Sequence, residues 1–567
     1  MYDVIIVGGG SAGSVLAGRL SEDPNLRVAL VEAGPPDRSV LIHCPAGLAL
    51  LAKNGQANWC LETVPQPGLN GRRGYQPRGK VLGGSSSINA MVYARGHASD
   101  YDAWAAEGNP GWAWADVLPY FKRAEHNERG ADAFHGTGGP LNVKDLTSPN
   151  PFGAHFVQAG REAGHTVNPD FNGASQEGVG HYQVTHKDGE RYSAAKAYLA
   201  PHRGRPNLTV VTDALVTRVV LDEEAGQPPR AVAVEYRGQG GRGPMQLLRC
   251  KEGGEVVLSA GAFGSPQLLM LSGIGPGEHL QAHGIRTVRA LPGVGGNLHD
   301  HVDVVLVMNA PKVTDLFGLS FKGALNALRG MAEWRRTRTG MLTSNFAEAG
   351  GFIKSSPDEA IPDLQLHFVI GKLVDHGRKT VFGHGFSCHV CLLRPRSRGT
   401  LRLASRDPQV APLIDPAFLQ DPDDLQRLVR GFKAMRTLVK QPALARFGGF
   451  ESRASADAQS DAQLEQFVRN HADTIYHPVG TCRMGHDAAA VVDHELRVHG
   501  VDGLRVVDAS VMPQVVGGNT NAPVIMMAEK AVDMIRAARR TAAPSMETGH
   551  DSGARGHPHR SLERIGV

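Results

Sequence analysis

A histidine followed by a proline stands late in the chain, in the segment TIYHPVGTCRMG at residues 474–485. Proline biases the residue before it away from the helical conformation, so His477 is expected in extended chain. An imidazole with a pKa near 6.5 can act as a neutral base at physiological pH. A second polar segment, GGNTNAP at residues 517–523, contains Asn519. Its carboxamide cannot act as a base but can donate a hydrogen bond. These two side chains could take the proton of an alcohol and orient its oxygen, if a cofactor accepts the hydride.

The second polar segment leads into a predicted helix, VIMMAEKAVDMIRAARR at residues 524–540. Pro523 would lie at its start, where proline is well tolerated. The positive end of the helix dipole would then lie close to Asn519 and could stabilise negative charge. His477 could equally be an ordinary loop histidine, and the choice depends on whether a cofactor site is built elsewhere.

The N-terminal segment YDVIIVGGGSAGSVLAGRLSEDPNLRVALVE has the order of a dinucleotide-binding unit. Asp3 to Val7 is an apolar run typical of a buried parallel strand, a helical pattern follows, and RVALV is the second strand. The glycines of a G-x-G-x-x-G motif allow the tight turn, the approach of a pyrophosphate and close helix–strand packing; here they are Gly8, Gly10 and Gly13. Glu32 ends the second strand, where it can accept hydrogen bonds from ribose hydroxyls. The pattern predicts a dinucleotide site without separating NAD from FAD.

A second glycine-rich segment, RGKVLGGSSSINAMVYARG at residues 78–96, is too apolar for a purely solvated loop. It resembles the first signature of the glucose–methanol–choline (GMC) flavin oxidoreductases, and GAFGSPQLLMLSGIG at 261–275 resembles the second. VGGNLHDH at 294–301, YHPVGT at 476–481, RVVDASVMP at 505–513 and the GGNTNAP segment are also similar to family motifs. The motifs occur in family order along nearly the whole chain. The nearest branches are bacterial FAD-dependent aliphatic alcohol dehydrogenases and choline dehydrogenases.

The resemblance implies FAD rather than NAD and assigns residues to it. The assigned residues are Gly83, Gly84, Ser86 and Asn89 along the flavin and pyrophosphate, Val216 near the adenine, Asp508 near the ribityl chain, and Asn521. Some relatives tether FAD covalently through a histidine at the position of Ile88. Isoleucine cannot form that bond, so non-covalent FAD is expected.

The resemblance also assigns the catalytic roles: His477 aligns with the base that accepts the proton, and Asn519 with its His or Asn partner, while the hydride goes to flavin N5. Glu348 aligns with a residue that meets the trimethylammonium group in choline oxidisers, and His367 with another pocket residue. A carboxylate can pair with a cationic head group, but Glu348 can equally be a structural acid. The expected reaction is oxidation of a primary, aliphatic alcohol to its aldehyde. Choline dehydrogenase, an oxygen-using alcohol oxidase and a non-redox lyase of the same fold remain alternatives.

Two lobes are expected, in a fold that combines α/β and α+β parts. A Rossmann-type FAD-binding lobe would cover residues 1–300. A substrate lobe at 301–475 would carry an antiparallel sheet covered by helices, because LQLHFVI and FSCHVCLLRPRSRGTLRLAS alternate apolar and polar residues. Residues 476–540 would return to complete the FAD lobe and the active site. The tail at 541–567 is rich in Pro, Gly, Ser, His and charges and is expected to be disordered.

The composition of the chain limits the kinds of partner and the location that are expected for the protein. The 567 residues are 41% hydrophobic and carry a net charge of +4 with both signs interspersed, so no nucleic-acid partner is expected. The six cysteines form no disulfide framework; Cys388 and Cys391 are interpreted as buried thiols, and no metal site is expected. Met1 leads directly into the first strand without a charged leader, and no apolar stretch is long enough to span a bilayer. A cytoplasmic protein is expected, with an alcohol and a quinone or electron-transfer protein as partners; contact with the inner membrane is compatible with this.

Overall fold

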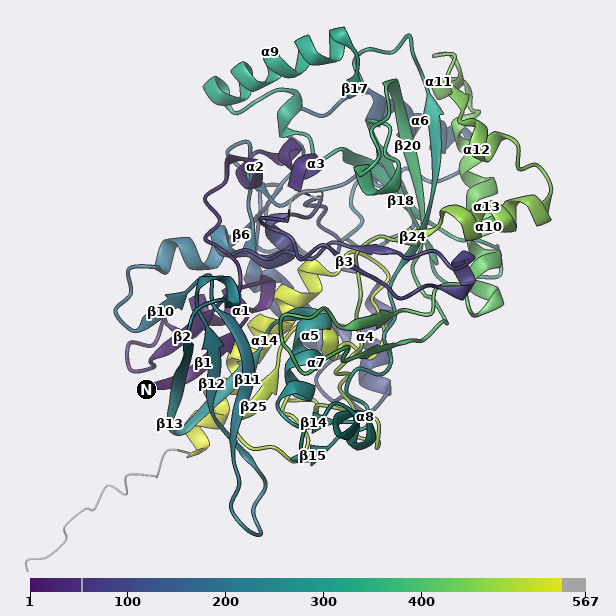
Figure 1. Ribbon diagram of the computed structural model, residues 1–567. Coiled ribbons are helices and arrows are strands. Elements are labelled where there is room, and N and C mark those ends of the chain that lie inside the picture. Colours follow the sequence, from purple (N-terminus) through teal and green to yellow (C-terminus); the bar gives the residue numbers. More distant parts are fainter. Residues whose placement is uncertain (52–54, 543–567) are drawn as a thin grey trace, which may run out of the picture.

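The computed structural model describes residues 1–51 and 55–542 (Figure 1). Within this part the chain forms two lobes, each built on one large sheet. The predicted combination of a Rossmann-type lobe with an antiparallel lobe is therefore confirmed. Of the tail predicted to be disordered, Thr541 and Ala542 end helix α14 (Asn521–Ala542), and the rest lies outside the described residues.

The first lobe contains the predicted parallel sheet. Its parallel strands lie in the order β10-β2-β1-β13, with β25 paired to β13 as well. Their bounds are β1 (Tyr2–Val7), β2 (Val28–Val31), β10 (Leu208–Val211), β13 (Met245–Leu258) and β25 (Leu504–Val506). Strands β11 (Leu215–Asp222) and β12 (Arg230–Arg237) extend the sheet in antiparallel fashion beyond β13. The late strand β25 thus joins the sheet that the first residues begin.

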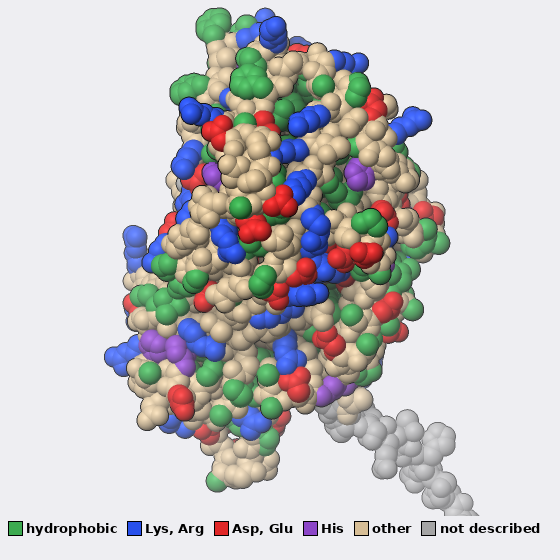
Figure 2. Space-filling model, turned by 90° about the vertical axis from the view of Figure 1, so that its right-hand side faces the viewer, with side chains coloured by type: hydrophobic (Ala, Val, Ile, Leu, Met, Phe, Trp, Pro, Cys, Tyr) green, Lys and Arg blue, Asp and Glu red, His purple; other side chains and the backbone are tan. Residues whose placement is uncertain are grey.

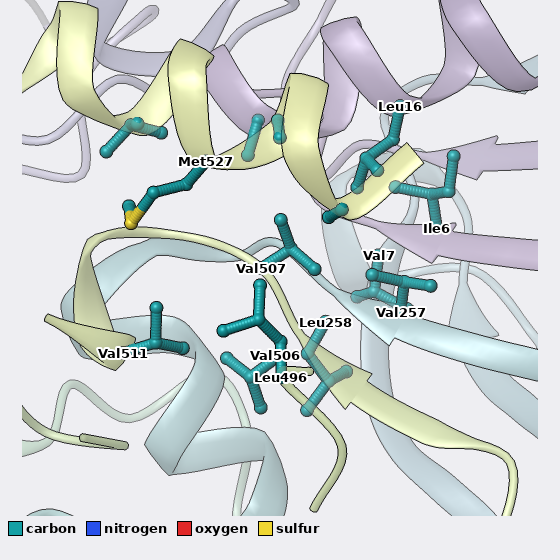
Figure 3. Close-up of a cluster of buried hydrophobic side chains, with 14 of the residues drawn as sticks. Ile6, Val7, Leu16, Val257, Leu258, Leu496, Val506, Val507, Val511 and Met527 are labelled. Atoms are coloured by element: carbon teal, nitrogen blue, oxygen red, sulfur yellow. The ribbon is translucent and has the colours of Figure 1, made fainter. Parts of the chain in front are cut away.

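Helix α1 (Ser11–Leu20) packs closely on β1 because Gly13 has no side chain. A Cβ added at Gly13 would lie only 1.9 Å from the carbonyl oxygen of Gly8. Helix α14 lies beside α1, and the two are joined by an ion pair of 2.9 Å between Arg19 and Glu529. Figure 3 shows side chains of β1, β13, α1 and α14 meeting in one hydrophobic cluster. The end of the chain is therefore part of the core of the first lobe.

The second lobe is an antiparallel sheet in the order β23-β16-β20-β19-β18-β7. The strands are β7 (Gly178–His181), β16 (Val302–Asn309), β18 (Ala347–Ile353), β19 (Leu364–Val369), β20 (Gly383–Leu392) and β23 (Phe450–Glu451); β17 (Gly318–Leu319) and β24 (Asp473–Thr474) pair with β20 and β16. Strand β7 belongs to this sheet although it precedes residue 300. A boundary between the lobes at residue 300 stays a prediction, and β7 is a segment before residue 300 that contributes to the second lobe.

Both faces of β19 and β20 are buried, whereas one covered face was expected. Apolar residues of one face, such as Leu366 and Phe368, pack under helices α6 (Pro151–Glu162), α10 (Pro422–Val439) and α13 (Asp461–His471). The opposite face carries polar side chains such as Gln365 and His367. The polar residues of the alternating pattern therefore lie on the face that the helices do not cover.

Further helices lie between these strands in the chain. They are α4 (Ala98–Ala106), α5 (Trp114–Ala124), α7 (Gly261–Leu271), α8 (Gly277–Ala282) and α9 (Phe321–Thr337). Among the helices of residues 1–51 and 55–542, none is both long and apolar enough to cross a bilayer. Cys388 and Cys391 are buried and not disulfide-bonded, on opposite faces of β20, as interpreted from the sequence.

Candidate active site

A cavity of about 2140 Å³ is lined by residues of both lobes. Eleven of the fifteen residues predicted for the site lie on its wall: Gly8, Gly10, Glu32, Gly84, Asn89, Val216, His367, His477, Asp508, Asn519 and Asn521. The other four are described by the structure but lie off the wall: Gly13, Gly83, Ser86 and Glu348. The cavity thus joins the N-terminal glycine turn to the segments around 477 and 519.

The start of helix α1 fits a pyrophosphate. The helix is capped by Gly10, and no side chain bonds to its first backbone N–H groups. A Cβ at Gly10 would have no neighbour closer than 3.9 Å, so its backbone faces open space. A Cβ at Gly84 would lie 2.7 Å from the Cα of Gly10, so the second glycine segment crosses directly over the first. Free N–H groups at a positive helix end form a ready anion site.

Gly83 and Ser86 hold the second glycine segment in place. The backbone N–H of Gly83 donates to the carbonyl of Gly9 at 2.7 Å. The hydroxyl of Ser86 donates to the carbonyl of Gly83 at 2.6 Å and accepts from the N–H of Ala194 at 3.0 Å. The donor and one of the two acceptor sites of this hydroxyl are used within the protein. The structure places Ser86 off the cavity wall, where it supports the second glycine segment; its predicted place along the cofactor stays a prediction.

Glu32 stands at the end of β2, where a ribose was expected. Its carboxylate accepts from the N–H of Gly9 at 2.7 Å and from the N–H of Gly34 at 2.8 Å. Burial raises the pKa of Glu32 to about 7, against the lowering effect of these two bonds. The carboxyl group therefore fixes the glycine turn, and Glu32 and Val216 of β11 both line the cavity.

Asp508 and Asn521 tie helix starts to the cavity wall. The Asp508 carboxylate accepts from the N–H of Gly261, at the start of α7, at 2.9 Å and from the hydroxyl of Ser265 at 2.5 Å. Burial raises the pKa of Asp508. Asn521 accepts from the hydroxyl of Ser11 at 2.7 Å, so the starts of α14 and α1 lie side by side. Helix α14 begins at Asn521, a little earlier than predicted.

The two predicted catalytic residues meet on the cavity wall. Nδ2 of Asn519 lies 3.3 Å from Nε2 of His477. On the other side of the ring, Nδ1 of His477 lies 3.0 Å from Nδ1 of His301. Nε2 of His301 lies 3.0 Å from the carbonyl oxygen of Leu393. Three groups therefore form a chain from a backbone carbonyl to the cavity.

This chain determines where the hydrogens sit. The carbonyl of Leu393 can only accept, so Nε2 of His301 carries the hydrogen. Burial lowers the pKa of His301 to about 3, so the ring is neutral and its Nδ1 is an acceptor. Nδ1 of His477 must then donate to it, which leaves the lone pair of His477 on Nε2, toward Asn519. The arrangement presents the basic nitrogen of His477 to the cavity wall, beside the amide N–H of Asn519.

The surroundings keep His477 uncharged. Burial lowers its pKa well below the usual value, and the nearby Arg78 adds to this effect. Asp300 holds the backbone instead: its carboxylate accepts from the N–H of His477 at 2.8 Å. Burial raises the pKa of Asp300 to about 6. Both His301 and Asp300 belong to the VGGNLHDH motif, but sequence analysis had given them no role.

Asn519 is oriented by strand β19. Nε2 of Gln365 donates to Oδ1 of Asn519 at 3.1 Å, so the NH₂ end of Asn519 points to His477. Gln365 also donates to the hydroxyl of Tyr182 at 3.3 Å. His367, two residues along the strand, lines the cavity, and burial lowers its pKa to about 3. Gln365 was missed by sequence analysis, although it shares the polar face of β19 with His367.

Glu348 is placed differently from its prediction as a pocket residue. Its side chain is fully buried, and its Oε2 accepts from the N–H of Asn150 at 2.6 Å. The geometry favours the alternative of a structural acid. Another carboxylate does line the cavity: Asp303 of β16, which lies 2.6 Å from Nδ1 of His389 on the neighbouring strand β20. This pair was not predicted, because strand pairing alone brings it together.

The two lobes and the cavity between them are typical of a nucleotide-binding oxidoreductase. The family model for GMC oxidoreductases matches residues 2–303 and again 395–528. The chain is 49% identical over 536 residues to the alcohol dehydrogenase [acceptor] of Pseudomonas putida, covering 94% of this chain and 96% of that one. It is 44% identical over 547 residues to the mitochondrial choline dehydrogenase of Mus musculus, covering 94% and 89%.

Solved structures agree in fold. The pyridoxine 4-oxidase from Mesorbium loti superposes with a TM-score of 0.83 at 32% identity, over 95% of this chain and 99% of that one. An FAD-dependent oxidoreductase from Chaetomium thermophilum superposes with a TM-score of 0.84 at 28% identity, over 95% and 100%. The chain belongs to the GMC oxidoreductase family, whose members bind FAD, and the predicted family and fold are confirmed.

Proposed function

We propose that the protein is an FAD-dependent dehydrogenase that oxidises primary aliphatic alcohols to aldehydes and passes the electrons to a quinone-type acceptor. The observation that carries this proposal is the 3.3 Å approach of Nδ2 of Asn519 to Nε2 of His477 on the cavity wall. Nδ2 of Asn519 is a donor and Nε2 of His477 is an acceptor, and a substrate hydroxyl needs one partner of each kind because it both accepts and donates. The likeness to an alcohol dehydrogenase [acceptor] supports the substrate class.

The two side chains divide the work on the alcohol. The substrate hydroxyl donates to Nε2 of His477, which takes the proton, while its oxygen accepts from Nδ2 of Asn519. Because His477 is held neutral by burial, it is ready to accept the proton over the whole physiological range of pH. The rings of His367 and His301 next to it are themselves buried.

The residues present fit FAD. Gly10 and the start of α1 would hold the pyrophosphate, Glu32 the ribose, Val216 the adenine side and Asp508 the ribityl side. When bound, FAD supplies the hydride acceptor that the reaction needs. The positive end of α14 at Asn521 lies on the same wall and favours negative charge there.

FAD is expected to be released when the protein is unfolded, because Ile88 on the cavity wall cannot form a covalent bond to the flavin. Denaturation in guanidinium followed by ultrafiltration should give a yellow filtrate and a colourless polypeptide. The absorbance of the two fractions near the flavin band measures the outcome. Colour that stays with the polypeptide would reject non-covalent binding.

Anaerobic mixing with primary aliphatic alcohols is expected to bleach the flavin band of the holoenzyme. A panel from butanol to dodecanol, with benzyl alcohol and choline, then ranks the substrates by rate of bleaching. Faster bleaching by choline would favour the choline dehydrogenase alternative. If no member of the panel bleaches the flavin band, alcohol oxidation is contradicted, and a non-redox lyase of the same fold is the remaining alternative.

The acceptor is tested on the reduced enzyme. We expect a quinone to restore the flavin band faster than oxygen does, and faster recovery with oxygen would instead make the protein an oxidase. A location in the cytoplasm, at the surface of the inner membrane, fits a quinone acceptor because quinones are dissolved in the bilayer.

A further inference from the structure

Large apolar side chains gather on one exposed surface of the second lobe. We call this surface the apolar patch; its members are Leu319, Phe321, Leu325, Leu328, Met331 and Phe382. Phe321 is 92% exposed, Phe382 77% and Leu328 61%. Figure 2 shows hydrophobic and basic side chains together at the top of the molecule, the end at which Figure 1 places α9. Scattered exposed apolar residues are ordinary, but a contiguous group marks an interaction surface.

Helix α9 presents most of the patch. Phe321, Leu325 and Leu328 recur at the spacing of one helical face and are all exposed. The opposite face attaches the helix to the protein: Trp334 is buried, and its indole donates to the carbonyl of Gly189 at 2.8 Å. Gly330, also buried, packs against the side chain of Met341. The helix is therefore firmly docked on one side, and its apolar face is left to a partner.

A row of cations runs beside the apolar face. Lys322, Arg329 and Arg336 lie seven residues apart and so share one flank of α9. With Arg335 the helix has four basic residues against one acid, Glu333. In the described part of the chain none of these four cations forms an ion pair with a protein carboxylate. An apolar face next to unneutralised cations is the pattern of a helix that lies in the headgroup region of a bilayer.

The patch also borders the mouth of the active-site cavity. Leu319, Phe321 and Phe382 line the cavity as well as the surface. Leu319 and Phe382 lie side by side, because β17 bridges to the segment before β20. A lipophilic molecule dissolved in a membrane would therefore meet the cavity without crossing water.

We infer that the apolar patch and the cations of α9 bind the surface of an anionic lipid bilayer, with the cavity mouth opened toward the lipid. A second copy of the chain is a poorer occupant, because a two-fold contact would bring the cation rows of both copies together. The inference deepens the proposed function, since it rests on that function for the nature of the substrate and acceptor. Binding to lipid itself requires no turnover.

The test is co-sedimentation of the holoenzyme, without alcohol or acceptor, with two kinds of vesicle. One kind is pure phosphatidylcholine and the other also contains anionic phosphatidylglycerol. We expect stronger binding to the anionic vesicles, weakened by added salt. The double variant F321Q/L328Q should bind at least about tenfold more weakly, because its apolar face is removed. Lys322→Glu with Arg329→Glu should lose the preference for anionic lipid.

Matched controls lie away from the patch. Met245→Gln removes a side chain that is 45% exposed on β13 of the first lobe, and Lys440→Glu reverses an exposed charge at the end of α10. Both should bind vesicles like the wild type. No binding to either vesicle, or equal binding by F321Q/L328Q, would overturn the inference. Mass photometry tests whether a second copy of the chain occupies the patch. A wild-type dimer that becomes a monomer in F321Q/L328Q would assign the patch to a second copy, which would also overturn the inference. The vesicle assay measures lipid binding and the bleaching assay measures alcohol oxidation. A negative result in one assay therefore does not decide the outcome of the other.

Discussion

Replacing His477 by glutamine is expected to slow the reduction of bound FAD by alcohol about 10²- to 10⁴-fold, the usual contribution of a general base. Nε2 of His477 is the basic atom that the structure directs to the cavity, 3.3 Å from the amide nitrogen of Asn519. Glutamine preserves a polar group of similar reach but has no basic nitrogen. Anaerobic stopped-flow absorbance of the flavin band measures the rate.

The control for this variant is a histidine outside the cavity. His155 of α6 is half-buried and contacts Arg446, far from the proposed chemistry. His155→Gln should reduce FAD at the wild-type rate. The visible spectrum of each variant reports whether FAD is bound, so loss of cofactor is separated from loss of chemistry. If the His477→Gln protein binds FAD and reduces it at the wild-type rate, His477 is not the base.

Much of the first lobe follows from local sequence, and the reason is physical. The strand–glycine–helix order at the N-terminus needs Gly13 because the backbones of α1 and β1 touch there. This contact requires glycine at one position of a short motif, so the motif can be recognised in the sequence without knowledge of the rest of the fold. The place of His477 beside Asn519 was inferred from a resemblance, and strand β25 and helix α14 explain it by returning the chain to the first sheet.

The parts that could not be predicted depend on contacts between distant segments. The bond from Gln365 to Asn519 joins β19 to the start of α14, and no spacing in the sequence encodes it. The resemblance assigned Ser86 to the cofactor, and nothing in the sequence indicated that its hydroxyl also accepts from the N–H of Ala194, more than a hundred residues away. In α9 the apolar period would predict a core face, and only the packing of Trp334 shows that the opposite side is docked.

Replacing His301 by leucine is expected to lower the rate of flavin reduction about 10- to 100-fold without removing the base. Nδ1 of His301 is the acceptor for the N–H of His477 at 3.0 Å. Without it, that buried donor is unsatisfied, which costs about 1–3 kcal/mol and disfavours the tautomer with a free Nε2. A cost of 1.4 kcal/mol corresponds to about tenfold in the population of the active form. The measurement is again the anaerobic rate, now taken as a function of pH.

Glutamine at position 301 separates positioning from packing. Its side-chain oxygen can accept from Nδ1 of His477, so His301→Gln should recover most of the rate that leucine loses. The pH profile gives a second signature. Because the ring of His301 is neutral, it acts on His477 as a hydrogen-bond acceptor, which stabilises the protonated imidazole more than the neutral one; leucine removes this acceptor, so the pKa of His477 falls further. A base with a lowered pKa becomes protonated only at lower pH, and the acid limb of the leucine variant should therefore move to lower pH than in the wild type. Equal losses for leucine and glutamine, with an unchanged acid limb, would mean that His301 only fills space.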